Sequence, residues 1–231
     1  MKLKILVLVA SIINFCVLPA SSQEQTPRLD TKDRFVPVIG RNGMVSSREK
    51  MASQVGVDIL QKGGNAVDAA VAVGFALAVT YPQAGNIGGG GFMVVHLADE
   101  NKSIAIDYRE MAPAAAHRDM YLNEDGSVNN ERSKFTHKAS GVPGTVAGMV
   151  HALENYGTMS LKDVMRPAYD LARKGFPMYN YLEGSLNARK ERLMQNEAAA
   201  KVFYKNDGTS YKYGEILKQK DLAWSLKRIM K

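Results

Sequence analysis

Cysteine is almost absent from this chain of 231 residues, in which Cys16 is the only one. Cys16 lies in an apolar stretch near the N-terminus, so the residues that follow it contain no thiol. This excludes disulfides and thiol chemistry from the body of the protein. Its stability therefore has to come from packing, for which an apolar content of 45% and a charged content of 23% are ordinary globular values.

Histidine is also scarce, with four residues at positions 96, 117, 137 and 151. Their spacing matches no metal-binding pattern, and their separations alone support no serine–histidine–aspartate set. The sequence therefore predicts no metal site. His96 falls within a predicted strand, where we expect it to be packed in the core.

Basic charge is in excess only in the C-terminal part of the chain. Residues 23–185 carry 17 basic and 18 acidic side chains, whereas residues 186–231 carry 11 basic and 5 acidic ones. A nucleic-acid surface would add aromatic stacking residues to such charges, and only scattered tyrosines and Trp224 are present. We interpret the charges as a solvated helical face and expect no nucleic-acid partner.

The first 22 residues have the three parts of a secretory signal peptide. Two lysines precede an apolar run at residues 5–17, and small residues occupy positions 20–22. The apolar run is too short for a membrane span. We therefore expect cleavage before Gln23, a periplasmic or secreted protein, and no stable membrane anchor. An uncleaved anchor is the alternative.

Residues 23–42 are polar and are expected to form an extended lead-in, after which two helices are predicted. Residues 46–49, Ser-Ser-Arg-Glu, have the pattern of a capping box with Ser46 as the N-cap. The helix that follows places apolar residues on one stripe, at positions 51, 55 and 59.

The second helix is predicted over residues 66–81, with Asn65 as its N-cap and Asp68 in its first turn. It is apolar almost all round, which indicates a buried helix. A membrane helix is less consistent with this pattern, because the run has only about 16 residues and contains Asp68.

A hairpin of largely buried strands is predicted at residues 92–97 and 104–108, directly after the glycine run 88–91. The run does not match a phosphate-binding loop, because no Lys-Ser/Thr follows it and a strand takes the place of the required helix. It is expected either to pack closely against backbone or to form a wall of an active-site cleft.

Arg109 is the candidate binding residue, because it follows the second strand and an unpaired guanidinium is costly to bury. Side chains alternate along a strand, so Asp107 and Arg109 should point one way and Tyr108 the other. The anion that Arg109 needs is either its neighbour Asp107 or Glu110, or a bound carboxylate, which matches the guanidinium fork with two hydrogen bonds.

From residue 139 to the end the pattern is helical, with predicted helices at residues 146–156, 160–174, 179–194, 197–203 and 221–230. The fold class is therefore α+β: helices, a central hairpin and an all-helical tail. A two-stranded hairpin rarely stands alone in water, so its strands should need further partners.

Several segments, all in one order, resemble the large-subunit signature of gamma-glutamyltransferases (gamma-glutamyltranspeptidases), which are N-terminal-nucleophile hydrolases. These segments are residues 63–72, 85–93, 106–113, 139–148 and 156–159. The resemblance runs from about Gly43 to the C-terminus. It implies that residues 43–231 are an incomplete large-subunit domain, the N-terminal part of an αββα sandwich.

The resemblance also implies a reaction. The intact protein would transfer the γ-glutamyl group of glutathione and related donors to water, amino acids or peptides through a γ-glutamyl-enzyme, without metal or cofactor. Arg109 would hold the α-carboxylate of the donor. The family's nucleophile is a threonine that self-cleavage exposes at the start of a small subunit, and no matching stretch occurs here. We therefore expect a fragment without the catalytic residue, inactive alone and partnered by the small subunit of the same precursor.

Two alternatives stay open. A related acylase that cleaves a glutaryl or cephalosporin-type amide would also use a carboxylate-binding arginine. A non-catalytic secreted module is the other alternative, and it would fold cooperatively by itself.

Overall fold

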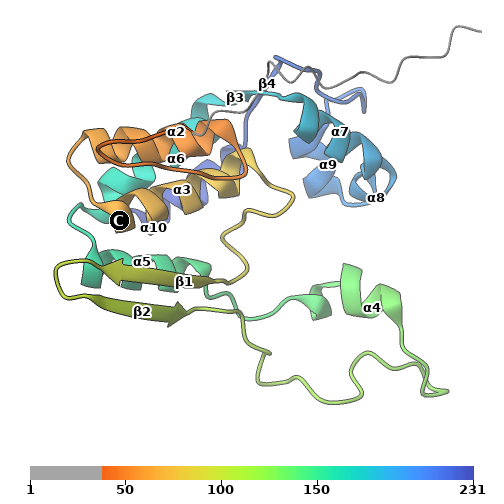
Figure 1. Ribbon diagram of the computed structural model, residues 1–231. Helices are drawn as coiled ribbons and strands as arrows, with labels where there is room; N and C mark the ends of the chain where they lie inside the picture. The colour runs from red at the N-terminus through yellow and green to blue at the C-terminus, as the bar shows by residue number, and fades with distance from the viewer. Residues whose placement is uncertain (1–37) are drawn as a thin grey trace, which may run out of the picture. The chain divides into compact units, whose positions relative to one another are not determined.

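Helix α3, Ala66–Thr80, lies at the centre of a group of packed helices (Figure 1). Eleven of its 15 residues are buried. Three helices contact it directly: α2 (Lys50–Gln61), α5 (Thr145–Tyr156) and α6 (Leu161–Lys174). Burial on all sides explains why the sequence of α3 is apolar all round, and the prediction of a buried helix is confirmed.

The computed structural model describes residues 38–231. The leader predicted for residues 1–22, Cys16 and the lead-in up to residue 37 lie outside the described residues. Gly40–Lys231 form one compact unit of mixed helices and short antiparallel strands, as an α+β class requires. None of the helices in the described part of the chain has the length and apolar character that a membrane span requires.

Helix α2 begins later than the sequence pattern indicates. Its N-cap is Glu49, whose carboxylate accepts hydrogen bonds from the backbone N–H groups of Met51 (2.9 Å) and Ala52 (3.0 Å). The prediction of Ser46 as N-cap is wrong, because the longer glutamate side chain reaches both free N–H groups itself. The predicted apolar stripe is confirmed, since Val55 and Ile59 are buried.

Strands β1 (Phe92–Leu97) and β2 (Lys102–Asp107) form the predicted antiparallel hairpin, with Phe92 opposite Asp107. The inner face of the hairpin lies against α5 (Figure 1). The outer face is open: Phe92 is 63% exposed and Val94 is 76% exposed. The expectation of largely buried strands is therefore wrong for the described chain, because alternate side chains of each strand point to a face that no described element covers.

His96 lies on this outer face and is exposed. Its Nδ1 atom is 3.1 Å from the hydroxyl of Ser103 on the neighbouring strand. The expectation of a packed core histidine is wrong for the same reason as the expectation of buried strands.

The C-terminal region is not entirely helical. Strands β3 (Phe176–Pro177) and β4 (Ile216–Leu217) pair antiparallel and bury Phe176 and Leu217. A two-residue strand is too short to leave a period in the sequence, which is why the prediction of an all-helical tail is wrong. The helices of this region are α7 (Asn180–Ala188), α8 (Lys190–Met194), α9 (Glu197–Phe203) and α10 (Lys220–Ile229).

Side chains of the C-terminal region also form hydrogen bonds with the last carbonyl groups of α3. The hydroxyl of Tyr179 donates to the carbonyl of Thr80 at 2.9 Å, and the buried side-chain amide of Gln219 donates to the carbonyl of Val79 at 2.7 Å. The last carbonyls of a helix have no partner within the helix. These two side chains supply such partners inside the protein, where water is excluded.

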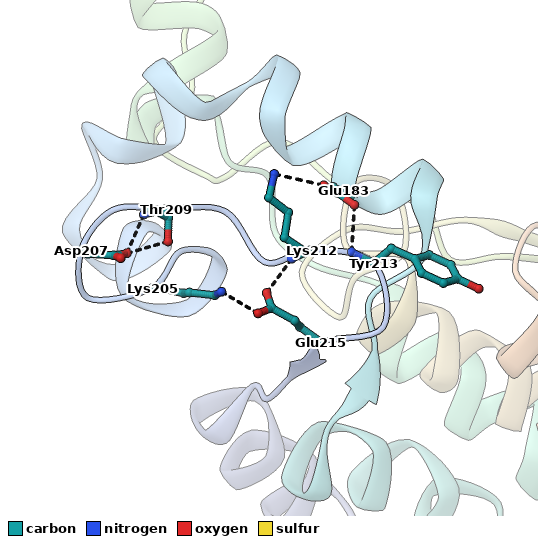
Figure 2. Close-up of polar contacts among 7 residues, drawn as sticks. All are labelled: Glu183, Lys205, Asp207, Thr209, Lys212, Tyr213 and Glu215. Carbon is teal, nitrogen blue, oxygen red and sulfur yellow. Dashed lines mark hydrogen bonds and ion pairs between the residues drawn. The ribbon is translucent and has the colours of Figure 1, made fainter.

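The loop between α9 and β4 is held by charged side chains (Figure 2). Glu215 accepts a hydrogen bond from the ammonium group of Lys205 and another from the backbone N–H of Lys212, each at 2.7 Å. Glu183 of α7 accepts from the backbone N–H of Tyr213 at 2.9 Å. The loop is therefore fixed to α7 and to its own two ends.

Residues 112–140 form a turn-rich excursion that includes one short α-helix, α4 (Asn130–Phe135). Glu131 of α4 accepts two hydrogen bonds from Arg192 of α8, at 2.6 and 3.1 Å. The guanidinium of Arg192 also lies 3.9 Å from the ring centroid of Phe135. These contacts tie the excursion to the C-terminal region.

Candidate substrate-binding site

Arg109 lies just beyond the end of β2, and its backbone conformation is fixed by Asp107. The backbone N–H of Arg109 donates to the carboxylate of Asp107 at 3.0 Å. The side chains alternate as predicted: Asp107 and Arg109 are exposed, whereas Tyr108 is half-buried on the inner face. Asp107 therefore serves the main chain of Arg109 and shapes the turn that presents its side chain.

The guanidinium of Arg109 forms no ion pair within the described residues. The ion pairs there join other side chains, and neither Asp107 nor Glu110 takes part in one. The geometry thus offers no support for an internal ion pair with either neighbour. The cost of burying an unpaired guanidinium cannot be the reason why Arg109 needs an anion, because Arg109 is exposed in this chain.

Tyr108 anchors the turn from the opposite side. Its ring lies against Gly148 of α5, so closely that a Cβ atom at Gly148 would overlap it. Its carbonyl oxygen lies against Gly144, where a Cβ atom would overlap it too. Burial raises the pKa of the Tyr108 hydroxyl. The ring is therefore a neutral packing group. The absence of a Cβ atom at Gly148 admits the ring, and its absence at Gly144 admits the carbonyl group of Tyr108.

The glycine run packs against the same turn. The carbonyl oxygen of Gly89 accepts from the backbone N–H groups of Gly144 (2.8 Å) and Thr145 (3.0 Å), at the start of α5. A Cβ atom at Gly90 would overlap the backbone nitrogen of Glu110. Of the two expectations for this run, the structure shows close packing of backbone against backbone.

A third contact closes the turn. Met111 and Val142 form an isolated antiparallel bridge, with N–H···O distances of 3.2 and 2.8 Å. This bridge joins the residue that precedes segment 112–140 to a residue just after it, next to Arg109. Three segments that resemble the family signature (85–93, 106–113 and 139–148) thus meet around this arginine.

The other two segments of the signature meet at Asp68, which sequence reasoning identified only as a residue of the first turn of α3. Asn65 and Asp68 form a capping box there. The buried carboxylate of Asp68 also accepts from the backbone N–H and the hydroxyl of Thr158, at 2.9 and 2.7 Å, and from the N–H of Met159 at 3.0 Å. It thereby joins residues 63–72 to residues 156–159.

Two opposing effects set the pKa of Asp68. Burial acts to raise it, and the hydrogen bonds from Thr158, Asn65 and Met159 act to lower it. The hydrogen bonds together outweigh burial, so the pKa is lowered and the group is a carboxylate at neutral pH. Four hydrogen bonds from Asn65, Thr158 and Met159 engage the carboxylate, which joins the start of α3 to residues 158–159 and so has a structural role.

No group of three His, Cys, Asp or Glu side chains within residues 38–231 has the arrangement of a metal site. Arg109 offers a permanently charged group that can donate two parallel hydrogen bonds from a turn held by the contacts above.

Comparison with known proteins shows the family of this chain. The family model described as Gamma-glutamyltranspeptidase matches residues 52–231. The chain is 46% identical over 226 residues to a glutathione hydrolase proenzyme of Escherichia coli (strain K12), which covers 96% of this chain and 39% of that protein. The crystal structure of Helicobacter pylori gamma-glutamyltranspeptidase is 42% identical, with a TM-score of 0.81 over 84% of this chain and 56% of that one. The likeness confirms the predicted fold class.

A more distant relative bears on the acylase alternative. The Acylase ACY 1 proenzyme of Pseudomonas sp. (strain V22) is 37% identical over 199 residues, covering 84% of this chain and 35% of that protein. The chain spans about two fifths or less of the length of the curated relatives that it matches. Both curated relatives described above are named as proenzymes, and both are longer than this chain.

Proposed function

This chain belongs to the gamma-glutamyltranspeptidase family, and from this we propose that residues 43–231 are the first part of the large subunit of a glutathione hydrolase. The whole protein transfers the γ-glutamyl group of glutathione and related donors to water, amino acids or peptides. The leader at residues 1–22 directs it to the periplasm or out of the cell.

The observation that carries this proposal is the setting of Arg109. Its guanidinium has no carboxylate partner among the described residues, while its backbone is held by Asp107, by the glycine run and by the Met111–Val142 bridge. A γ-glutamyl donor carries an α-carboxylate, to which a guanidinium donates two parallel hydrogen bonds. Arg109 thus positions the donor and takes no part in bond making.

The reacting group is a threonine at the start of a small subunit, beyond this chain. Its hydroxyl attacks the γ-carbonyl, the leaving amine departs, and a γ-glutamyl ester forms that water or an acceptor amine then cleaves. The small subunit of the same precursor also covers the open face of the hairpin, where Phe92 and Val94 are exposed. No metal or cofactor is needed for these steps.

The activity is tested with a γ-glutamyl anilide on the full-length protein and on the 231-residue chain. We expect the full-length protein to release the aniline and the 231-residue chain to release none. Turnover by the 231-residue chain alone would refute the assignment of the nucleophile to another segment.

A glutaryl acylase is the second candidate, because a 37% identical relative is named as an acylase and Arg109 suits a glutaryl carboxylate equally well. A glutaryl group is a γ-glutamyl group without its α-amine. Comparing kcat/KM for the two anilides on the full-length protein separates the candidates, and we expect the γ-glutamyl donor to be preferred.

A further inference from the structure

Helices α6 and α10 pack side by side and turn a strongly basic face outward. Buried residues such as Ala168 and Leu226 form the inner side of the two helices. The outer side carries six cations, which we call the basic face: Lys162, Arg166, Arg173, Lys227, Arg228 and Lys231.

The basic face surrounds an open hollow of about 570 Å³. All six of its cations except Arg228 line the hollow, together with Tyr169 and Met230. The guanidinium groups of Arg166 and Arg173 lie 5.7 and 5.6 Å from the ring centroid of Tyr169. At such distances the electron-rich face of the ring attracts both cations.

The acidic side chains nearby do not balance these charges. Asp170 is shared by Arg166, Arg173 and Lys174, at 3.5, 3.5 and 3.4 Å. The two helices with Lys231 carry eight basic side chains and three acidic ones. The face therefore keeps a positive charge that attracts anions.

Trp224 adds an apolar element to this charge. It lies on the outer side of α10 and is 61% exposed, with the guanidinium of Arg228 4.8 Å from its ring centroid. Lys227 follows it by three residues and Arg228 by four, so both lie on its side of the helix. An exposed tryptophan among lysines and arginines is typical of helices that lie at the headgroup layer of a membrane.

We propose that the basic face docks peripherally on an anionic phospholipid surface. Lipid phosphates pair with the cations, and Trp224 enters the headgroup layer. A solvated helical face explains the charge, but it explains neither the hollow that five cations share nor the exposed tryptophan. This inference is independent of Arg109 and of the proposed reaction.

The test is cosedimentation of the full-length protein with vesicles of phosphatidylcholine alone, or of phosphatidylcholine with phosphatidylglycerol. The variant is Lys162→Ser, Lys227→Ser and Lys231→Ser together, because none of these lysines is in an ion pair within the described chain. The matched control has the same change in charge elsewhere: Lys50→Ser, Lys62→Ser and Lys201→Ser, three exposed lysines that are also outside those pairs.

We expect the wild-type protein to bind the anionic vesicles and to lose binding as salt is raised. Each cation near such a surface contributes roughly fivefold in affinity, so the triple variant should bind about 100-fold more weakly and the control far less so. Subtracting the fluorescence spectrum of Trp224→Phe from that of the wild type gives the emission of Trp224. This emission should shift to shorter wavelength when the protein binds vesicles. Turnover of a γ-glutamyl anilide should be the same in all variants.

Three results would overturn the proposal. The first is equal loss of binding in the variant and the control, or no binding at all. The second is equal binding to neutral vesicles. The third is release of the protein from anionic vesicles by a competitor at constant ionic strength. Release by a few millimolar inorganic phosphate would assign the hollow to a soluble phosphate ligand. Release by short duplex DNA would assign the face to nucleic acid.

Discussion

The carboxylate of Asp107 accepts a hydrogen bond from the backbone N–H of Arg109 at 3.0 Å and forms no ion pair with its guanidinium. The two charged side chains are near neighbours on one face, yet the carboxylate is engaged by the main chain. Among the described residues, this arrangement leaves the guanidinium of Arg109 without an ion pair.

Replacement of Arg109 by alanine in the full-length protein should weaken donor binding. Truncating one partner of a charge pair that becomes buried when the donor binds costs roughly 2–5 kcal/mol, about 30-fold to several thousand-fold in KM for a γ-glutamyl anilide. Steady-state kinetics measure the change. Arg118→Ala is the matched control, since Arg118 is an exposed arginine paired with Asp119, and its KM should stay within about twofold of wild type.

Gly148→Ala should destabilise the protein although alanine favours helices. The new methyl group would overlap Tyr108, and overpacking costs about 1–3 kcal/mol. Gly184→Ala in α7 is the control, because a Cβ atom there meets nothing within 4 Å and should add up to about 1 kcal/mol. Urea denaturation of the full-length protein measures both. Equal effects of the two substitutions would show that Gly148 is not required for the Tyr108 contact.

Asp68→Asn should lower the free energy of unfolding by roughly 2–4 kcal/mol at neutral pH. Both oxygens of the buried carboxylate accept hydrogen bonds, and an amide replaces one of these oxygens by an NH2 group that cannot accept. The matched control is Asp207→Asn. The carboxylate of Asp207 also accepts from the N–H and hydroxyl of a threonine, Thr209 (Figure 2), but it is exposed. Its replacement should change stability by less than about 0.5 kcal/mol.

The contribution of Asp68 should depend on pH with a defined sign. Its pKa is lowered in the folded protein, and an unfolded aspartate has a pKa of about 3.9. The stabilisation is therefore complete above that value and is lost as pH falls through the folded pKa. Urea curves from pH 7 down to pH 2 should show the wild type and Asp68→Asn converging only below pH ~4. A constant difference over this range would contradict the role of the carboxylate.

The exposed apolar face of the hairpin should make the 231-residue chain prone to aggregation. We expect this chain to bind a hydrophobic dye and to aggregate, and Val94→Ser to reduce both, because Val94 is largely exposed on that face. In the full-length protein the same substitution should weaken assembly of the two subunits. If residues 23–231 unfold cooperatively and bind no hydrophobic dye before unfolding, this would instead support a module that folds by itself.

The sequence predicted local structure wherever a strong signal lies within a few residues. The helix capped by Asn65 and the alternation that separates Tyr108 from Arg109 are examples, and both are confirmed. It failed where the outcome depends on contacts made elsewhere. Glu49 displaced Ser46 as a cap through its longer reach, and the strands β3 and β4 exist only because Phe176 and Leu217 meet across a long separation in sequence.

The candidate site shows the same limit. The type of residue and its position in the chain indicated Arg109, but its exposure and the engagement of Asp107 by the backbone depend on packing around the hairpin. The link from Asp68 to Thr158 spans 90 residues, and no local pattern contains it.

The most direct test of Arg109 is a substrate–variant cycle on the full-length protein, with γ-glutamyl and 4-aminobutyryl anilides as donors. The second donor lacks only the α-carboxylate. We expect Arg109→Ala to lower kcat/KM about 30-fold or more for the γ-glutamyl donor and to leave the already weak 4-aminobutyryl donor within about threefold of its wild-type value. An equal loss for both donors would contradict carboxylate binding by Arg109 and would assign the residue a structural role.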